Sequence, residues 1–261
     1  VGVKLPYFVA GPASAAASLI ALTPDGAPVA DTTITVTGSH VQWISTRRAE
    51  GSGFYTWDTE RKEVPAGSWT VTTAAAPVPL TIPFTTGGYF TLEVRGRGEN
   101  GRTSVTRTSF YVLGDGYTAW ARYDHNRIDL VPEKQTYRPG DTARLMIQSP
   151  WEQATALVTT EREGIRSHRR FALTSTQQSI EVPITEDDVP NVFVSVLLVK
   201  GRTNPAPSAA TATSATADTS DPGKPSFRLG YVELKVEDRA KRLTVTVNAD
   251  REEYRPASKA T

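Results

Sequence analysis

The chain has 261 residues, and its 29 Lys and Arg nearly balance its 28 Asp and Glu, so the sequence offers no electrostatic case for nucleic acid or an anionic membrane as partner. Cysteine is absent, which excludes disulfides, thiolate catalysis and cysteine-based metal sites. No run of about 18 apolar residues predicts a transmembrane helix. We expect any targeting signal or lipid anchor to lie outside this sequence.

The first half of the chain predicts short strands separated by tight turns. Val1–Leu5 alternates like a strand, whereas the apolar run Ala13–Leu22 fits either a helix or a strand. Further strands are predicted at residues 32–37, 41–46, 54–58, 68–73, 89–94 and 103–112. Asp25-Gly26 and Asn100-Gly101 are hairpin turn signals. Pro77 and Pro79 break the pairing or confine their segment to a sheet edge.

The second half repeats this pattern around the turn Tyr137-Arg-Pro-Gly-Asp141. Pro and Gly favour a tight reversal there, between strands predicted at residues 127–131 and 142–148. Further strands are predicted at residues 154–161, 166–173, 179–184, 192–199 and 227–236. The apolar run Val192–Val199 indicates a central strand covered on both faces. A second copy of the turn begins at Tyr254 and follows a similar strand, which indicates tandem domains.

These patterns predict an all-β chain of tandem antiparallel β-sandwiches of fibronectin- or immunoglobulin-like type. We place a first sandwich at residues 1–115, a connector at 116–126 with Trp120 in the domain junction, and a second sandwich at 127–239. A flexible loop is expected at 203–226, because that segment lacks large apolar residues. Residues 240–261 are expected to form the first strand of a third domain, so the chain is expected to be part of a longer protein.

Motifs that suggest chemistry have plainer explanations here. Gly96–Gly101 matches G-x-G-x-x-G, but the β-type segment after it favours a hairpin over a dinucleotide site. His40, His125 and His168 lie in or beside predicted turns and lack ligand spacing. Ser52 does not lie in a nucleophile elbow. We therefore predict no catalytic, cofactor-binding or metal-binding residues, and no enzyme activity.

Charged and aromatic residues are interpreted in the same way. Glu186–Asp188 is interpreted as a solvated turn, because a calcium site needs oxygens from several spaced positions. The mixed-charge hairpin Glu161–Arg170 is interpreted as soluble surface, with a domain–domain contact as the alternative. The five Trp favour core or junction packing over a sugar-stacking platform. The loop Thr203–Ser226 is either a plain connection or a protease-accessible segment flanked by basic residues.

Particular segments of both halves occur in the same order as in one known protein family. In the second half these are Arg127–Leu130, Tyr137–Pro150, Ala156–Ile165, Pro190–Val196 and Gly201-Arg202. In the first half they are Asp25–Val29, Gly87–Tyr89, Asn100-Gly101 and Phe110–Gly114. Through these segments the chain resembles bacterial alpha-2-macroglobulins, and its two sandwiches are similar to the macroglobulin-like domains that lead into the bait-region domain of that family.

The resemblance implies a structural part of a broad-range protease inhibitor that cages proteases after bait cleavage. It implies proteases and neighbouring macroglobulin-like domains as partners, no cofactor, and a periplasmic or cell-envelope location. It places the bait in a domain beginning near Lys241, mostly beyond Thr261, and any Cys–Gln thioester elsewhere in the protein. The second turn copy departs from the family pattern, with Ala257-Ser258 in place of Gly-Asp.

Two other classes of protein fit a β-sandwich chain without catalytic motifs. The first alternative is an adhesion or ligand-binding module of a large cell-surface protein. The second is an accessory β-domain of a carbohydrate-active enzyme.

Overall fold

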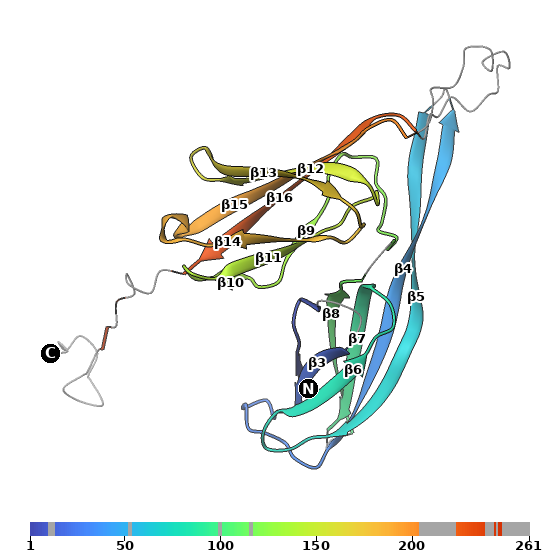
Figure 1. Ribbon diagram of the computed structural model, residues 1–261. Helices are drawn as coiled ribbons and strands as arrows, with labels where there is room; N and C mark the ends of the chain where they lie inside the picture. Colours follow the sequence, from blue (N-terminus) through green and yellow to red (C-terminus); the bar gives the residue numbers. More distant parts are fainter. Residues whose placement is uncertain are drawn as a thin grey trace, which may run out of the picture.

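The computed structural model describes residues 1–9, 14–51, 54–98, 101–114, 117–203, 223–237, 243 and 245–246. In these residues the strands form four sheets, which pack in pairs into two β-sandwiches (Figure 1). The predicted all-β class is therefore confirmed. The predicted domain boundaries stay predictions, because residues 204–222 and nearly all of 238–261, including the second turn copy, lie outside the described residues.

The first sandwich pairs a three-stranded sheet with a five-stranded sheet. The smaller sheet has the order β1 (Gly2–Lys4), β3 (Ser14–Ile20), β6 (Val78–Pro83). The larger has the order β2 (Phe8–Val9), β8 (Thr103–Val112), β7 (Gly88–Arg97), β4 (Thr33–Gly51), β5 (Phe54–Thr72). Between them lie Leu19, Ile34, Leu92 and Phe110, all nearly inaccessible to solvent. The ambiguous apolar run is thus a strand, and Pro79 lies on the edge strand β6.

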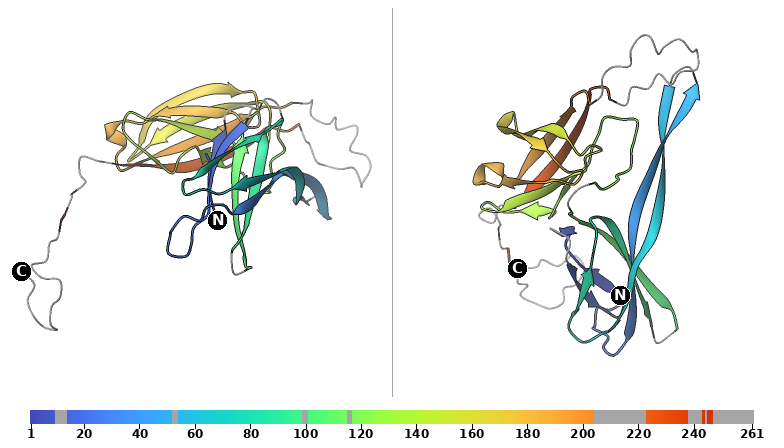
Figure 2. Two further views of the ribbon diagram at one scale, coloured as in Figure 1. Left: turned by 90° about the horizontal axis from the view of Figure 1, so that it is seen from below. Right: turned by 45° about the vertical axis from the view of Figure 1, so that its right-hand side comes forward.

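Strands β4 and β5 form a long two-stranded ribbon that the sequence did not predict. Each has 19 residues, and they pair continuously from Thr33–Thr72 to Gly51–Phe54. Strand β7 pairs with β4 only as far as Val41, so the rest of the ribbon extends beyond the sheet (Figures 1 and 2). The predicted break near residue 38 is instead a register shift between Gly38 and Ser39.

The prediction of four separate strands in this region was therefore wrong. The charged stretch at residues 60–63 belongs to β5 and does not separate two strands. Beyond the sheet, among the described residues, no second layer packs on the ribbon and only the connector lies against one of its faces, so its residues need not alternate between apolar and polar. Charged residues in this segment therefore gave no sign of strand structure.

The second sandwich has the same two-layer construction. Its smaller sheet has the order β14 (Ser179–Pro183), β11 (Thr142–Ile147), β9 (Leu130–Pro132). Its larger sheet has the order β10 (Thr136–Tyr137), β16 (Ser226–Val236), β15 (Asn191–Lys200), β12 (Ala154–Glu161), β13 (Ile165–Leu173). Leu145, Val194 and Leu198 are inaccessible to solvent in the core between the sheets. A short 3-10 helix, η1 (Glu186–Asp188), precedes β15.

The turn after Tyr137 is a tight reversal, as predicted. The Asp141 amide donates to the Arg138 carbonyl at 2.9 Å, and the Asp141 carboxylate accepts from the Arg138 amide at 3.1 Å. Gly140 has a φ of 89°, which glycine adopts without steric cost. The strands on either side belong to different sheets, because β10 pairs with β16 and β11 pairs with β14 and β9. The turn therefore carries the chain from one layer to the other.

The Tyr137 hydroxyl gives the second sandwich a pH-dependent stability at alkaline pH. Burial, with smaller contributions from Glu133 and Asp141, raises the pKa of Tyr137 to about 12. In the unfolded chain a tyrosine has a pKa near 10, so the folded state holds this proton more tightly. The resulting stabilisation is fully present below about pH 10 and is lost as the pH rises towards 12, a change of about 2–3 kcal/mol.

We expect this loss to appear as a pH-dependent difference between the wild-type chain and Tyr137→Phe. Urea denaturation at a series of pH values from about 9 to 12 measures it, because phenylalanine has no proton to lose. The stability advantage of the wild-type chain over Tyr137→Phe should shrink across this range. Parallel stability curves for the two proteins would contradict the assignment.

Strand β15 is the middle strand of its five-stranded sheet, as predicted, but it is not covered on both faces. Its residues alternate between a buried set facing the core and an outward set. On the outward side Val199 is 45% exposed, and Phe227 and Tyr231 on the neighbouring β16 are 50% and 56% exposed. The apolar run therefore encodes a core face and an outer apolar face that the described residues leave open to solvent.

Candidate functional site

Trp120 is the centre of the junction between the two sandwiches. Its side chain is 8% exposed and packs in a small apolar cluster with Phe8 and Leu113 from the first sandwich and Met146 from the second. The indole nitrogen donates to the Thr176 carbonyl at 2.6 Å. The junction role predicted for Trp120 is therefore confirmed.

A loop of the second sandwich also binds the end of the first through close backbone contact. The Thr118 amide donates to the Thr176 hydroxyl at 2.7 Å, and the Gln177 side-chain amide donates to the Gly114 carbonyl at 2.8 Å. A Cβ atom placed on Gly87 would lie 2.5 Å from the Gln177 side-chain nitrogen, and one placed on Gly114 would lie 3.1 Å from the same nitrogen. Glycine at these two positions therefore permits the approach.

The long β4–β5 ribbon binds the connector from the other side. The Arg122 amide donates to the Ser45 hydroxyl at 3.2 Å, and the Thr59 hydroxyl donates to the Arg122 carbonyl at 2.9 Å. The Trp57 amide donates to the Asp124 carboxylate at 3.1 Å. The connector is thus hydrogen-bonded along the ribbon as well as packed through Trp120. These contacts restrict how the two sandwiches move relative to each other.

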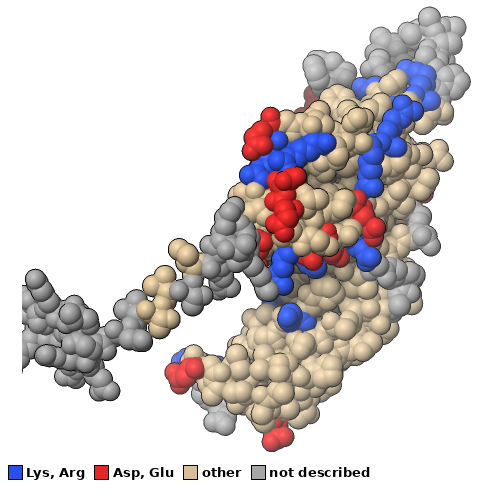
Figure 3. All heavy atoms as spheres, turned by 60° about the vertical axis from the view of Figure 1, so that its left-hand side comes forward, with Lys and Arg blue, Asp and Glu red and all other residues tan. Residues whose placement is uncertain are grey.

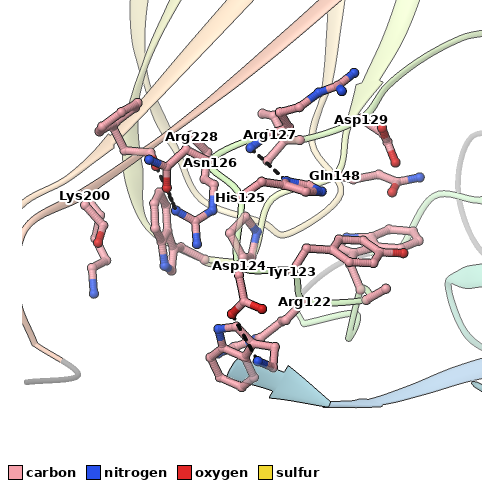
Figure 4. A pocket seen from close by; sticks show the side chains of 18 of the residues that line it. Arg122, Tyr123, Asp124, His125, Asn126, Arg127, Asp129, Gln148, Lys200 and Arg228 are labelled. Carbon is pink, nitrogen blue, oxygen red and sulfur yellow. Dashed lines mark hydrogen bonds between the residues drawn. The ribbon is translucent and has the colours of Figure 1, made fainter. Parts of the chain in front are cut away.

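Between the ribbon, the connector and the second sandwich lies a cleft of about 1000 Å³ (Figure 4). Six basic side chains line it: Arg47, Arg122, Arg127, Lys200, Lys224 and Arg228. Two carboxylates line it, those of Asp124 and Asp129. Four of the five Trp also contribute to its walls: Trp43, Trp57, Trp120 and Trp151. The cleft is thus both basic and aromatic, in a chain with nearly balanced charge.

Basic side chains in the cleft lie over aromatic rings. The Arg122 guanidinium lies 4.8 Å from the centre of the Trp57 ring, and that of Arg228 lies 5.3 Å from the Trp151 ring. The Lys200 ammonium lies 5.7 Å from the same Trp151 ring. Burial, followed by repulsion from Arg122, lowers the pKa of Arg228. Arg122 and Arg228 are therefore close enough to repel each other.

The structure places the three histidines in unlike surroundings. His40 and His168 lie within β4 and β13, so the prediction that both lie in or beside turns was wrong for these two. His40 stacks on Phe90 at 4.6 Å, and burial lowers its pKa. His125 lies in the connector and stacks on Tyr123 at 5.0 Å. For His40 the long ribbon explains the error, because it continues through the residues interpreted as a turn.

The acidic run at residues 186–188 caps a helical turn. The Asp188 carboxylate accepts from the Thr185 amide at 2.8 Å and from its hydroxyl at 2.9 Å, and it pairs with Arg166 at 3.4 Å. Arg162 donates to the Asp187 carbonyl at 2.9 Å. The mixed-charge hairpin thus contacts its own sandwich, and Figure 3 shows charges of both signs side by side on this face. No group of three potential metal ligands occurs within the described ranges.

The segment matching G-x-G-x-x-G is a hairpin between two antiparallel strands, as predicted. Strands β7 and β8 pair from Gly88–Val112 to Arg97–Thr103, and the Gly101 amide donates to the Gly98 carbonyl at 2.9 Å. No helix follows that would bind a pyrophosphate.

Over the part of the chain that the structure describes, no helix is long and apolar enough to cross a membrane.

The cleft was not predicted from the sequence. Its basic and aromatic residues come from β4, β5, β7, β8, residues 120–127, the β11–β12 loop, β15, and the segment from Lys224 into β16, which are far apart along the chain. Only the position of Trp120 in the connector indicated where the two sandwiches meet. The other Trp residues were expected to pack in cores or in the junction, and Trp69 does pack against the first core.

The sequence matches a known family over its second half. The family model described as the alpha-2-macroglobulin bait region domain matches residues 128–261, just over half of the chain. The chain therefore belongs to the alpha-2-macroglobulin bait region domain family. The match begins at the start of the second sandwich and extends through the segment assigned to a third domain. Members of this family are protease inhibitors and not enzymes, which agrees with the prediction of no enzyme activity.

Individual relatives belong to the same family. An alpha-2-macroglobulin homolog from Nostoc sp. is 24% identical over 155 residues, which is 59% of this chain and 8% of the relative. The native conformation of E. coli alpha-2-macroglobulin is 19% identical, with a TM-score of 0.37, over 93% of this chain and 14% of that one. Salmonella alpha-2-macroglobulin reacted with methylamine is 20% identical, with a TM-score of 0.33, over 88% and 13%. The chain thus spans a small part of its relatives, and the family assignment rests on the match of the family model.

Proposed function

We propose that this chain is part of a protease-trapping inhibitor of the alpha-2-macroglobulin type. The observation that carries the proposal is the family match over residues 128–261, which includes the whole second sandwich. In this proposal proteases are the partners of the whole protein. Cleavage of a bait segment triggers a rearrangement of the domains of the whole protein, and the rearranged domains enclose the protease.

The two sandwiches have a mechanical role in this proposal. Trp120, the Gln177 hydrogen bond to Gly114 and the ribbon contacts to Arg122 join them into one unit. A close-packed interface between domains does not deform continuously. A small displacement of one domain therefore moves the domain packed against it as a whole. A displacement of the second sandwich would therefore carry the first with it.

The proposal is tested on the full-length protein with trypsin. Limited cleavage is expected to change its mobility in native electrophoresis, and the cleaved protein is expected to retain trypsin during size-exclusion chromatography. Trypsin with a blocked active site is the matched control, and it should produce neither effect. Cleavage without a mobility shift and without retained trypsin would contradict a bait-triggered trap.

The proposal includes a periplasmic or cell-envelope location for the whole protein. Its support is the bacterial origin of the alpha-2-macroglobulin relatives. Fractionation of cells expressing the full-length protein tests the location. Recovery in the cytoplasmic fraction alone would contradict it.

A further inference from the structure

Basic side chains from separate elements converge on the cleft between the sandwiches. Arg122 comes from the connector, Lys200 from the end of β15 and Arg228 from β16, and the lining includes four more basic groups than carboxylates. Figure 4 shows Arg122, Asp124, Lys200 and Arg228 around the same opening. Charges of one sign that line a concave surface focus the potential and favour an oppositely charged ligand.

Arg122 and Arg228 keep hydrogen-bond donors available. The Arg122 side chain lies over Trp57 and makes no hydrogen bond or ion pair with any described residue. Arg228 uses one terminal nitrogen, which donates to the Asn126 side chain at 2.7 Å and to the Phe227 carbonyl at 2.9 Å. A guanidinium carries five N–H donors in a planar fork that fits a carboxylate. Both arginines are thus able to bind carboxylates without breaking their present contacts.

The aromatic walls hold these guanidinium groups and offer further surface. Trp57 lies beneath Arg122, and Trp151 lies against both Arg228 and Lys200. These cation–π contacts restrict the two guanidinium groups, which lowers the entropy lost when a ligand binds. In the part of the chain that the structure describes, the indole N–H groups of Trp57 and Trp151 donate to no residue, so peptide carbonyls are suitable partners for them.

We propose that this cleft binds an acidic peptide segment, with Arg122 and Arg228 each binding a carboxylate and the Trp rings contacting the neighbouring residues. A peptide fits better than a nucleic acid, because Asp124 and Asp129 line the same cleft and would repel a continuous phosphate backbone. A peptide alternates carboxylates with neutral groups, which matches basic groups that are separated by rings. The site does not depend on whether the whole protein traps proteases.

The test uses the full 261-residue chain and fluorescence anisotropy of a labelled peptide of alternating glutamate and serine. We expect saturable binding that weakens as sodium chloride is raised. The same peptide with glutamine in place of glutamate is the ligand control and should bind far more weakly. Arg122→Gln is expected to weaken binding of the acidic peptide about tenfold, because it removes a charge-assisted contact.

Matched variants separate the site from general charge effects. Arg170→Gln removes the same charge from the exposed strand β13, outside the cleft, and should leave the affinity unchanged. Lys224→Gln removes another basic group of the cleft and should also weaken binding of the acidic peptide. Because Lys224 lies outside the connector, this variant tests the cleft independently of any disturbance of the connector by Arg122→Gln. Circular dichroism and thermal unfolding check that each variant folds.

Three outcomes overturn the proposal. The first is no saturable binding of the acidic peptide at low salt. The second is an equal loss of affinity in Arg122→Gln and Arg170→Gln, which would indicate a general charge effect. The third is preferential binding of a labelled single-stranded oligonucleotide, which would identify the cleft as a nucleic-acid site.

Discussion

Replacing Trp120 with alanine is expected to lower the free energy of unfolding by about 3–5 kcal/mol, the usual cost of deleting a buried aromatic side chain. The variant loses the packing of Trp120 against Phe8, Leu113 and Met146, and it leaves the Thr176 carbonyl without its indole donor. Because this cluster joins the two sandwiches, we also expect their unfolding to separate into two transitions. Urea denaturation followed by circular dichroism measures both effects.

Two further variants show which part of the Trp120 contact matters. Trp120→Phe keeps a ring but removes the N–H donor, and it should cost about 1–2 kcal/mol. Tyr123→Ala removes a connector aromatic that is 51% exposed, and it should change stability by no more than about 0.5 kcal/mol. A single transition with an unchanged midpoint in Trp120→Ala would show that Trp120 does not couple the sandwiches.

Replacing Phe110 with alanine is expected to destabilise the first sandwich by about 3–5 kcal/mol. Phe110 is 1% exposed, and its ring centre lies 5.2 Å from that of Phe84 and 5.8 Å from that of Phe90. The cavity would lie between the two sheets of this sandwich, where neighbouring rings fill it only in part. Thermal unfolding with fragment-resolved hydrogen exchange should place the loss of protection in strands β4, β7 and β8.

Phe227→Ala is the matched control for Phe110→Ala, because both variants remove the same side chain. Phe227 is 50% exposed on the outer face of the second sandwich, so its removal leaves no enclosed cavity and should cost less than about 1 kcal/mol. An equal loss of stability in the two variants would contradict the placement of Phe110 in a core. Reduced protection in β12 and β15 of the Phe110 variant would contradict its confinement to the first sandwich.

Strands with one buried face were predictable, because alternation marks that face directly. Strand β7 alternates so that Phe90, Leu92 and Val94 enter the core, and β14 buries Ile180 and Val182 in the same way. The turn around Gly140 was also predictable, because proline and glycine restrict the backbone locally. These features depend on near neighbours in the chain, which a sequence displays.

The β4–β5 ribbon was not predictable in the same way. Its outer half lies outside the sandwich core, so charged residues such as Arg61 and Glu63 occur in the middle of a strand and pair with each other at 2.5 Å. The open outer face of β15 was missed for a related reason. An apolar run shows that a segment is hydrophobic, but not which of its two faces the fold covers.

The candidate site shows the same division. Trp120 was expected at the junction because it lies in the connector, and a short connector must pass between the domains it joins. The meeting of Arg122 with Trp57, and of Arg228 with Trp151, was not expected. Each pair brings together residues at least 65 positions apart, and no local pattern marks such a contact.

The sequence by itself determined that the chain is all-β, that it turns after Tyr137, and that it is similar to alpha-2-macroglobulins, because these properties follow from local alternation, turn residues and recognisable segments. The tertiary structure decided the length of the ribbon, the coupling of the two sandwiches through Trp120, and the basic aromatic cleft between them. These depend on packing between distant segments, which sets the side chains that meet and the charges that are brought together.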